Sequence, residues 1–283
     1  MGKQIEEYEL PTFEVEPEVI LDSIAGRQKC KKCSKKIRFF CYNCVLVVDE
    51  LASQLPELHL PIKLHVIKHR GENNGKSTAV YAKIMAPSTV AMYTYPEKEN
   101  TLNIDPETSL LLYPGEGAKT MEELADEGQL QKYRDLVVID GTWPQANGII
   151  SNESRPEHAS KHNMETKRIL QNMQRVTITP RKTKFWRYQS LDSSYMATIE
   201  AIYFCYYEYS NAMQKCNMAN VVDTGCRNTE KNCEEKSEDR PSGDIKDLLY
   251  FYKYYYNVIQ NRYKSDKSLV FHSFQAKDYI KYD

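Results

Sequence analysis

The chain has 283 residues, of which 41% are hydrophobic and 27% are charged, a composition typical of globular rather than disordered proteins. Lys and Arg total 38 and Asp and Glu total 39, so the net charge of −1 excludes a uniformly basic nucleic-acid binder and confines any anion-binding surface to part of the molecule. The apolar runs are too short to cross a bilayer, and the opening MGKQIEEYEL lacks the apolar core of a secretory signal, so we expect a reducing compartment.

The first 26 residues are acidic and contain Pro11 and Pro17. Acidic, proline-containing stretches bury little apolar surface. We therefore predict a flexible, loosely ordered acidic arm at residues 1–26.

Residues 27–48 contain the strongest local chemical signal, a doubled CxxC pattern. Cys30 and Cys33 are followed, after seven residues, by Cys41 and Cys44. Two such pairs can offer four thiolates to one tetrahedral Zn²⁺, and a site filled by four protein ligands stabilises a fold without activating water. Four free thiols or a redox dithiol are the alternatives. Seven cations surround the cysteines, forming either a solvated charged face or a phosphate-binding patch: Arg27, Lys29, Lys31, Lys32, Lys35, Lys36 and Arg38.

The remaining residues, 49–283, form the main domain, in which strand-like and helix-like segments alternate. Such alternation is typical of an α/β fold with a mostly parallel sheet flanked by helices. Residues 214–244 are polar and irregular, so we expect an exposed insertion there. In chain order we predict a strand at Ile62–Ile67, a helix at Ser77–Ala86, strands at Val90–Tyr95 and Ser109–Tyr113, a helix at Met121–Gln131, strands at Leu136–Ile139 and Arg175–Thr179, and helices at Ser194–Tyr209 and Lys246–Arg262.

A second basic segment covers residues 161–188, with eight Lys or Arg residues against one acid. Its end interleaves cations with Phe185, Trp186 and Tyr188. Cations neutralise phosphates and aromatic rings stack on unpaired bases, which favours an RNA-binding surface. A strand with one buried aromatic face gives the same pattern.

A buried strand ends at Asp140, which opens the segment Asp-Gly-Thr-Trp-Pro-Gln-Ala. Ligands of open α/β sheets bind at the carboxyl ends of strands, so a carboxylate there is a candidate catalytic group. The alternative is that Asp140 only caps the turn, in which Thr142 is a candidate N-cap.

Several segments in a fixed order resemble the DTW-domain proteins, the tRNA-uridine aminocarboxypropyltransferases, and most closely their eukaryotic type-1 members. The resemblance spans residues 27 to 210 and extends to the aromatic helix Leu248–Arg262. One departure is Met196-Ala-Thr, where the family commonly has Leu-Ser-Thr. The segments are the doubled CxxC, Ile67–Glu72, Gly75–Thr78, Leu111–Pro114, Asp140–Gln145, Arg181–Arg187 and Ala197–Ala201.

This resemblance implies a specific reaction. Such enzymes transfer the 3-amino-3-carboxypropyl group of S-adenosylmethionine to N3 of a uridine in tRNA and release methylthioadenosine. The type-1 resemblance points to position 20 of the D-loop. It also implies a SPOUT-like fold with a knotted carboxyl-terminal segment, tRNA as the partner, and a nuclear location or otherwise a cytoplasmic one. No membrane association, secretion or obligate protein partner is expected.

With this resemblance, candidate residues can be assigned to roles. Asp140 would accept or organise the N3 proton, assisted by Thr142 and Trp143, although Trp143 could equally pack in the core. Candidates for binding S-adenosylmethionine are Leu112, Tyr113, Pro114, Ile139, Gln145, Thr198, Ile199 and Glu200. Candidates for binding RNA are Lys76, Ser77, Arg181, Lys182, Lys184, Trp186 and Arg187, of which Arg181 or Arg187 could instead pair with the cofactor's carboxylate. The candidate zinc ligands are Cys30, Cys33, Cys41 and Cys44.

Two other functions fit parts of the same pattern. One is an S-adenosylmethionine-dependent RNA methyltransferase on the same scaffold. The other is a non-enzymatic zinc-ribbon adaptor that binds RNA, although an adaptor has no need of an Asp at the end of a strand.

Overall fold

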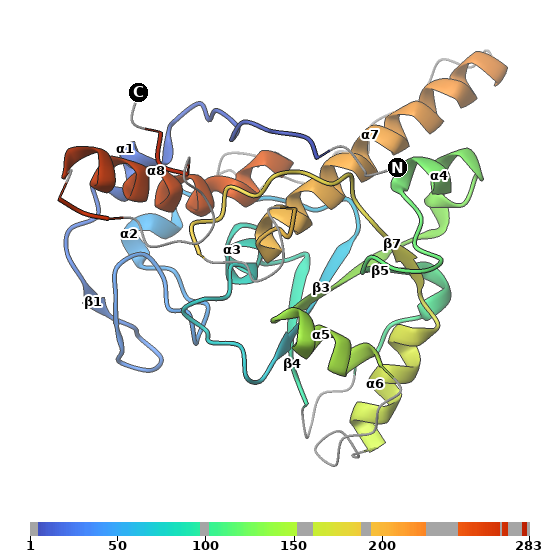
Figure 1. Ribbon diagram of the computed structural model, residues 1–283, viewed down its shortest axis with the longest axis horizontal. Helices are drawn as coiled ribbons and strands as arrows, with labels where there is room; N and C mark the ends of the chain where they lie inside the picture. The colour runs from blue at the N-terminus through green and yellow to red at the C-terminus, as the bar shows by residue number, and fades with distance from the viewer. Residues whose placement is uncertain are drawn as a thin grey trace.

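A five-stranded parallel sheet lies at the centre of the computed structural model, which describes residues 5–96, 102–151, 161–187, 194–224, 243–266, 268–270 and 279–281 (Figure 1). The strand order is β4-β3-β6-β5-β7, and all four neighbouring pairs are parallel. This confirms the predicted α/β class and parallel sheet. The strands are β3 (Lys63–His69), β4 (Val90–Tyr95), β5 (Ser109–Leu112), β6 (Asp135–Asp140) and β7 (Gln174–Val176).

Helices cover both faces of this sheet (Figure 1). Among the described residues, no helix combines the length and the apolar character that a membrane span requires. The α-helices are α1 (Pro17–Leu21), α2 (Asp49–Ala52), α3 (Ala79–Met85), α4 (Met121–Asp126), α5 (Trp143–Ile150), α6 (Lys161–Gln171), α7 (Thr198–Thr224) and α8 (Tyr250–Ser265). Short 3₁₀ helices are η1 (Pro106–Thr108), η2 (Leu130–Lys132) and η4 (Ile245–Leu249), and a separate two-stranded hairpin pairs β1 (Gln28–Lys29) with β2 (Lys36–Ile37).

The period-2 alternation of the strands divides the core between the two faces of the sheet. Leu64 and Val66 of β3 lie in the larger hydrophobic cluster, with residues of α3, α4, α7 and α8. Ile67 lies in the smaller cluster, with residues of α5 and α6. Because both faces are buried, the strands carry nearly continuous apolar runs, which is why the sequence pattern identified them.

Neighbouring strands β3 and β6 form the switch point of the sheet. The chain leaves the carboxyl end of β3 through α3 toward β4, at one edge. It leaves β6 through α5 and α6 toward β7, at the opposite edge. Connections that diverge in this way leave a crevice at the carboxyl ends of the two strands, and Asp140 lies there.

The amino-terminal residues pack against the domain, in contrast to the loosely ordered arm that their composition predicts. Leu21 is fully buried and α1 contacts α8. Glu6 forms a parallel bridge with Arg181, through hydrogen bonds of 3.0 and 2.8 Å with the backbone of residues 180 and 182. Five of the seven acidic side chains in residues 5–26 form ion pairs with basic side chains elsewhere in the chain, which composition by itself does not show.

Helix α7 is longer than its pattern indicated. It begins at Thr198 and continues to Thr224, so the first part of the expected insertion is helical. No Gly or Pro interrupts residues 210–224, and the helix continues where the pattern led us to expect a loop. Residues 225–242 of that insertion lie outside the described part of the chain.

Candidate active site

Asp140 is the last residue of β6 and is only 2% exposed. Its Oδ2 accepts a hydrogen bond of 2.6 Å from the Ser77 hydroxyl, and its Oδ1 accepts one of 2.7 Å from the Thr198 hydroxyl. Ser77 precedes α3, and Thr198 is the first residue of α7. Three segments far apart in sequence therefore meet at one carboxylate.

Burial raises the pKa of the Asp140 carboxyl above its usual value. The hydrogen bonds from Ser77 and Thr198 and the charge of Lys68 oppose this effect. A carboxylate whose pKa is raised binds a proton more readily, as a general base must. Asp140 thus has a proton acceptor's environment, and among the described residues it forms no ion pair.

The turn after Asp140 is held by Gln145. The Thr142 N–H donates to Gln145 Oε1 at 2.8 Å, and Thr142 is the N-cap of α5, as predicted. Gly141 allows this close arrangement, because a Cβ there would lie 2.9 Å from Gln145 Oε1. Gln145 therefore bonds to the backbone of the turn, whereas the Asp140 carboxylate bonds to the hydroxyls of Ser77 and Thr198.

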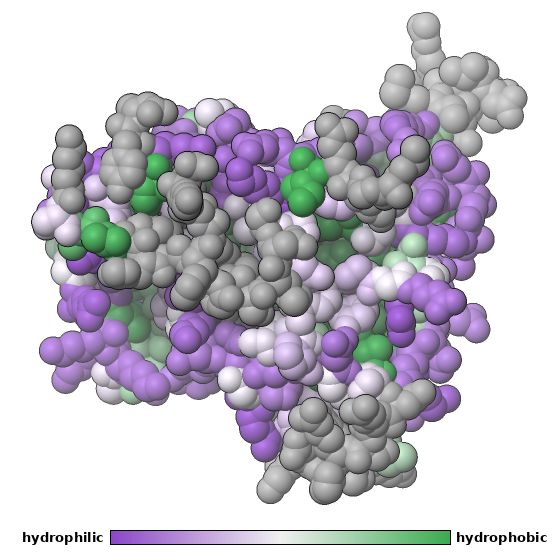
Figure 2. All heavy atoms as spheres, viewed as in Figure 1, coloured by the Kyte–Doolittle hydropathy of each residue, from purple (hydrophilic) through white to green (hydrophobic). Residues whose placement is uncertain are grey.

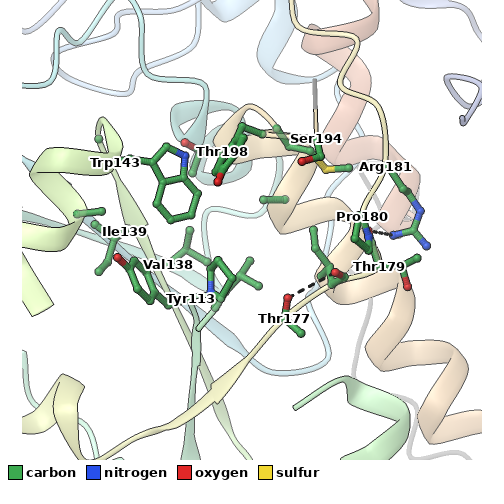
Figure 3. A pocket seen from close by; sticks show the side chains of 18 residues that line it. Tyr113, Val138, Ile139, Trp143, Thr177, Thr179, Pro180, Arg181, Ser194 and Thr198 are labelled. Atoms are coloured by element: carbon green, nitrogen blue, oxygen red, sulfur yellow. Dashed lines mark hydrogen bonds between the residues drawn. The ribbon is translucent and has the colours of Figure 1, made fainter. Parts of the chain in front are cut away.

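A first cavity, of about 280 Å³, opens beside the carboxyl ends of β5 and β6 (Figure 3). We call it the apolar cavity, since Leu112, Val138 and Ile139 line much of its wall. Figure 3 shows Tyr113 beside these strand ends and Thr177 to Arg181 along the other side. Its shape and lining suit a ligand with an apolar, ring-containing part.

A second cavity, of about 900 Å³, lies on the other side of the Asp140 turn. We call it the polar cavity, because Glu72, Lys76, Asp140 and Arg187 line it. The two cavities share four lining residues, namely Gly141, Trp143, Met196 and Thr198. Two ligands in adjoining cavities could therefore meet next to Asp140.

The candidate cofactor residues divide between the cavities and the interior. Leu112, Tyr113, Pro114, Ile139 and Thr198 line the apolar cavity, whereas Gln145 lines the polar one.

Ile199 and Glu200 line neither cavity. Ile199 is fully buried and its N–H donates to the Thr78 hydroxyl at 3.2 Å. The Glu200 carboxylate, also fully buried, accepts hydrogen bonds from the hydroxyls of Tyr8 and Thr183 and from the N–H groups of Lys184 and Ala197. The family resemblance of Ala197–Ala201 suggested a cofactor contact for Glu200, but its oxygens join three segments of the chain.

Thr142 and Trp143 both border the polar cavity. Thr142 is exposed, and Trp143 is half-buried with ring contacts to Tyr113 and Tyr195 at centroid distances of 5.8 and 5.0 Å. The indole thus packs against aromatic rings and borders both cavities, and its assistance to Asp140 stays a prediction.

The candidate RNA-binding residues fall into two groups. Lys76, Ser77, Trp186 and Arg187 line the polar cavity, although the Ser77 hydroxyl is bonded to Asp140. The Arg187 guanidinium donates to the carbonyls of Gly75 and Lys76 at 3.1 and 2.8 Å. These contacts hold the segment after β7 against the loop that precedes α3.

The second group, Arg181, Lys182 and Lys184, meets acidic partners. Arg181 is 9% exposed and pairs with Glu208 at 2.6 Å. It also lies 3.5 Å from Glu6, while Lys182 and Lys184 lie 2.8 and 3.7 Å from Glu7 and Glu9. The amino-terminal acids thus neutralise the charges that the sequence assigned to RNA phosphates.

Sequence reasoning did not assign a role to Glu72. It follows β3, lines the polar cavity and lies near Asp140. Burial and the neighbouring Asp140 charge raise the pKa of the Glu72 carboxyl. Its place in the sequence could have indicated it, because Glu72 follows β3 and the carboxyl ends of the adjacent parallel strands β3 and β6 lie at the same edge of the sheet.

The four predicted zinc ligands form one cluster. The Sγ atoms of Cys30, Cys33, Cys41 and Cys44 all lie within 4.8 Å of one another, which fits a tetrahedral Zn²⁺ site. Backbone N–H groups of residues 33 and 32 lower the pKa of the Cys30 thiol to about 7. Desolvation and the neighbouring thiols raise the pKa of Cys44 to about 12, because the thiols disfavour a further negative charge. A divalent cation would relieve this repulsion.

Comparison with known proteins gives one family. Residues 38–258 match the DTW domain. A Xenopus tropicalis protein named tRNA-uridine aminocarboxypropyltransferase 1 is 30% identical over 278 residues, covering 85% of this chain and 82% of that protein. Mouse and human proteins of the same name are each 28% identical over 277 residues, covering 84% of this chain and 78% of theirs. No solved structure matches the chain.

Proposed function

The chain belongs to the DTW domain family, and from this premise we propose that it transfers the 3-amino-3-carboxypropyl group of S-adenosylmethionine to N3 of a uridine in tRNA. One observation carries the proposal. Asp140, a buried carboxylate free of ion pairs among the described residues, lies where two cavities of different polarity adjoin.

The apolar cavity is the proposed site for S-adenosylmethionine. Leu112, Val138 and Ile139 would contact the adenine and ribose, and the polar groups of Tyr113 and Thr177 to Thr179 line the same cavity. The amino-acid part of the donor would then point toward Gly141 and Thr198, where the polar cavity begins. Arg181, whose charge Glu208 already meets, is a weaker candidate for its carboxylate than its sequence position suggested.

The polar cavity is the proposed site for the uridine. Its volume accommodates a nucleotide, and Trp186 and Trp143 offer rings for stacking. Lys76 and Arg187 place positive charge beside the phosphate that such a nucleotide carries. A uridine taken from a loop reaches this cavity at low unstacking cost.

Asp140 is the proposed acceptor of the N3 proton. Uridine N3 is protonated at neutral pH and becomes a strong nucleophile only as that proton leaves, and a positioned base contributes about 10² to 10⁴ in rate. The ionised N3 would attack the carbon of the aminocarboxypropyl arm that is bonded to the sulfonium sulfur. That carbon–sulfur bond would break with its electrons on sulfur, and methylthioadenosine would leave. Ser77 and Thr198 would hold the carboxylate in place during the transfer.

Finer features of the family resemblance belong to the same proposal. We take position 20 of the D-loop as the target, the nucleus as the compartment and Zn²⁺ as the occupant of the four-cysteine cluster. We also propose a SPOUT-like topology with a threaded carboxyl-terminal segment. The return of the segment after β7 to the loop before α3, through the contacts of Arg187, supports that topology.

The test is incubation of the purified protein with unmodified tRNA and labelled S-adenosylmethionine, followed by mass spectrometry of nucleosides and small molecules. The expected products are a uridine that carries the aminocarboxypropyl group and an equal amount of methylthioadenosine. A methylated nucleoside would instead identify a methyltransferase. Binding of tRNA without any methylthioadenosine would identify an adaptor.

A further inference from the structure

The two basic clusters of the sequence differ in whether acidic side chains of the same chain already pair with their cations. The cluster at Arg181 to Lys184 lies against Glu6, Glu7 and Glu9 of the amino-terminal segment. RNA phosphates could bind there only after displacing these carboxylates. This cluster is therefore poorly suited to be the main RNA contact.

The cluster on the β1–β2 hairpin is in the opposite state. Residues 27–48 contain no Asp or Glu, and of their cations only Lys31 and Arg38 pair with an acid among the described residues, namely with Asp49 and Asp22. In the part of the chain that the structure describes, no ion pair involves the other five cations, and all five are exposed: Arg27, Lys29, Lys32, Lys35 and Lys36.

The register of the hairpin adds an independent observation. Lys29 and Lys36 are directly opposite each other in the antiparallel pair. Like charges in this position destabilise a hairpin. The repulsion persists because the cysteine cluster holds the hairpin, and a bound polyanion would relieve it.

The cysteine-rich module, residues 27–48, of which the hairpin is a part, also contacts the loop at the rim of the polar cavity. Asn43, between two cysteines, accepts a hydrogen bond of 2.8 Å from Asn74 in the loop between β3 and α3. The neighbours of Asn74 in that loop, Asn73 and Lys76, line the cavity. Hydrophilic side chains dominate the lower left of the surface in Figure 2, where Figure 1 places β1.

We propose that the β1–β2 hairpin, through Lys29, Lys36 and their unpaired basic neighbours, binds the sugar–phosphate backbone of the tRNA whose uridine enters the polar cavity. This inference rests on the proposed function. It assigns the RNA-docking surface to the cysteine-rich module, and not to the Arg181–Lys184 segment that the sequence favoured. Cations spread over a metal-held hairpin suit a polyanion with regularly spaced charges.

The test compares tRNA binding by the unmodified protein, a K29Q/K36Q variant and a charge-matched K63Q/K132Q control, measured without S-adenosylmethionine between 50 and 200 mM salt. Lys63 and Lys132 are exposed and lie near the amino ends of β3 and β6, away from both cavities. We expect K29Q/K36Q to raise Kd about tenfold at low salt and to reduce the salt slope by about 2, since each lost phosphate contact removes about one released counterion. The control should keep the parent's values.

Other readouts separate this inference from the proposed function. Zinc content should be the same in all three proteins, the thermal midpoint should not fall in either variant, and kcat at saturating tRNA should be retained in K29Q/K36Q. Equal tRNA affinity of parent and K29Q/K36Q would overturn the docking surface alone. Loss of affinity in K182Q/K184Q with none in K29Q/K36Q would move that surface to the other cluster. Failure of the parent to bind tRNA would overturn both proposals.

Discussion

At the scale of single residues, the candidate site depends on a carboxylate that is buried but not neutralised by a cation. Asp140 has two hydroxyl donors, one on each oxygen, and no ion-pair partner among the described residues. Hydroxyl groups stabilise its negative charge less than an Arg or Lys would, so burial remains the larger effect on its pKa. The raised pKa makes the carboxylate a better proton acceptor than an exposed Asp.

Replacing Asp140 with Asn should remove the proton acceptor and leave the packing intact. The amide has the same shape, and the hydroxyls of Ser77 and Thr198 can reorient toward it. We expect transfer to fall by about 10² to 10⁴ while S-adenosylmethionine binding and the thermal midpoint change little. Single-turnover assays and calorimetry measure this, with D126N, at an exposed position, as the control. Activity retained in D140N would contradict the role of Asp140 as the base.

Replacing Ser77 with Ala should change the pH dependence of the reaction. Asp140 can accept a proton only when it is ionised, so kcat/KM should fall as pH decreases through its pKa. The Ser77 hydrogen bond lowers that pKa, so its loss raises it and moves the acid limb to higher pH. A pH profile checks this, with S88A, at an exposed position, as the control. An acid limb that does not move would mean that another group controls it.

At the scale of elements, the cysteine module is joined to the main domain by aromatic packing. Phe39 and Phe40 lie just before the second CxxC pair and are buried. Phe39 contacts Tyr254 at 5.3 Å and Phe40 contacts Phe251 at 5.0 Å between ring centroids, and both partners belong to α8. The module is thus part of the core.

Removing the metal should therefore destabilise the whole domain. Without a cation the clustered thiolates repel each other and the turns that position Phe39 and Phe40 open. We expect one Zn²⁺ per chain, and a fall of the thermal midpoint by at least about 5 °C on chelation or in C41S. Metal analysis and thermal unfolding test this, and C216S, outside the cluster, should keep both values. A metal-free protein with an unchanged midpoint would exclude a structural zinc.

At the scale of the whole molecule, a few buried polar groups join segments that are distant in sequence. Glu200 links Tyr8 of the amino-terminal segment and Thr183 of the basic segment to the first turn of α7. Tyr8 lies between Glu7 and Glu9, which pair with Lys182 and Lys184. Its hydrogen bond to Glu200 therefore holds the amino-terminal segment against these basic residues. The charge pattern of the surface therefore depends on this interior contact.

Replacing Glu200 with Gln should weaken the fold and not the chemistry. The amide presents only one acceptor oxygen to donors that now use two, so we expect a loss of about 2 to 3 kcal/mol in the free energy of unfolding. Denaturant unfolding measures this loss. The control is E122Q, which breaks the exposed ion pair of Glu122 with Lys215 and should change stability by under about 1 kcal/mol. A loss of turnover per folded molecule with unchanged stability would instead indicate a role in the active site.

The sequence by itself determined the features that depend on local pattern. Short, nearly continuous apolar runs gave the central strands, because these are buried on both faces, and doubled CxxC spacing gave the four-cysteine cluster, because two tight turns bring four sulfurs together. Asp140 was identifiable as a candidate because a strand end in a parallel sheet is a ligand position.

Only the tertiary structure decided which side chains meet. Ser77 and Thr198, separated from Asp140 by 63 and 58 residues, were assigned to RNA and cofactor but bond to its carboxylate. Glu200 was placed in the cofactor site by the family resemblance of its segment. The cations near residue 182 looked open to RNA, although acids some 175 residues away cover them. Hydrophobic periodicity reports the environment of a segment, whereas the partner of a polar group depends on how segments pack, and that information lies in the fold.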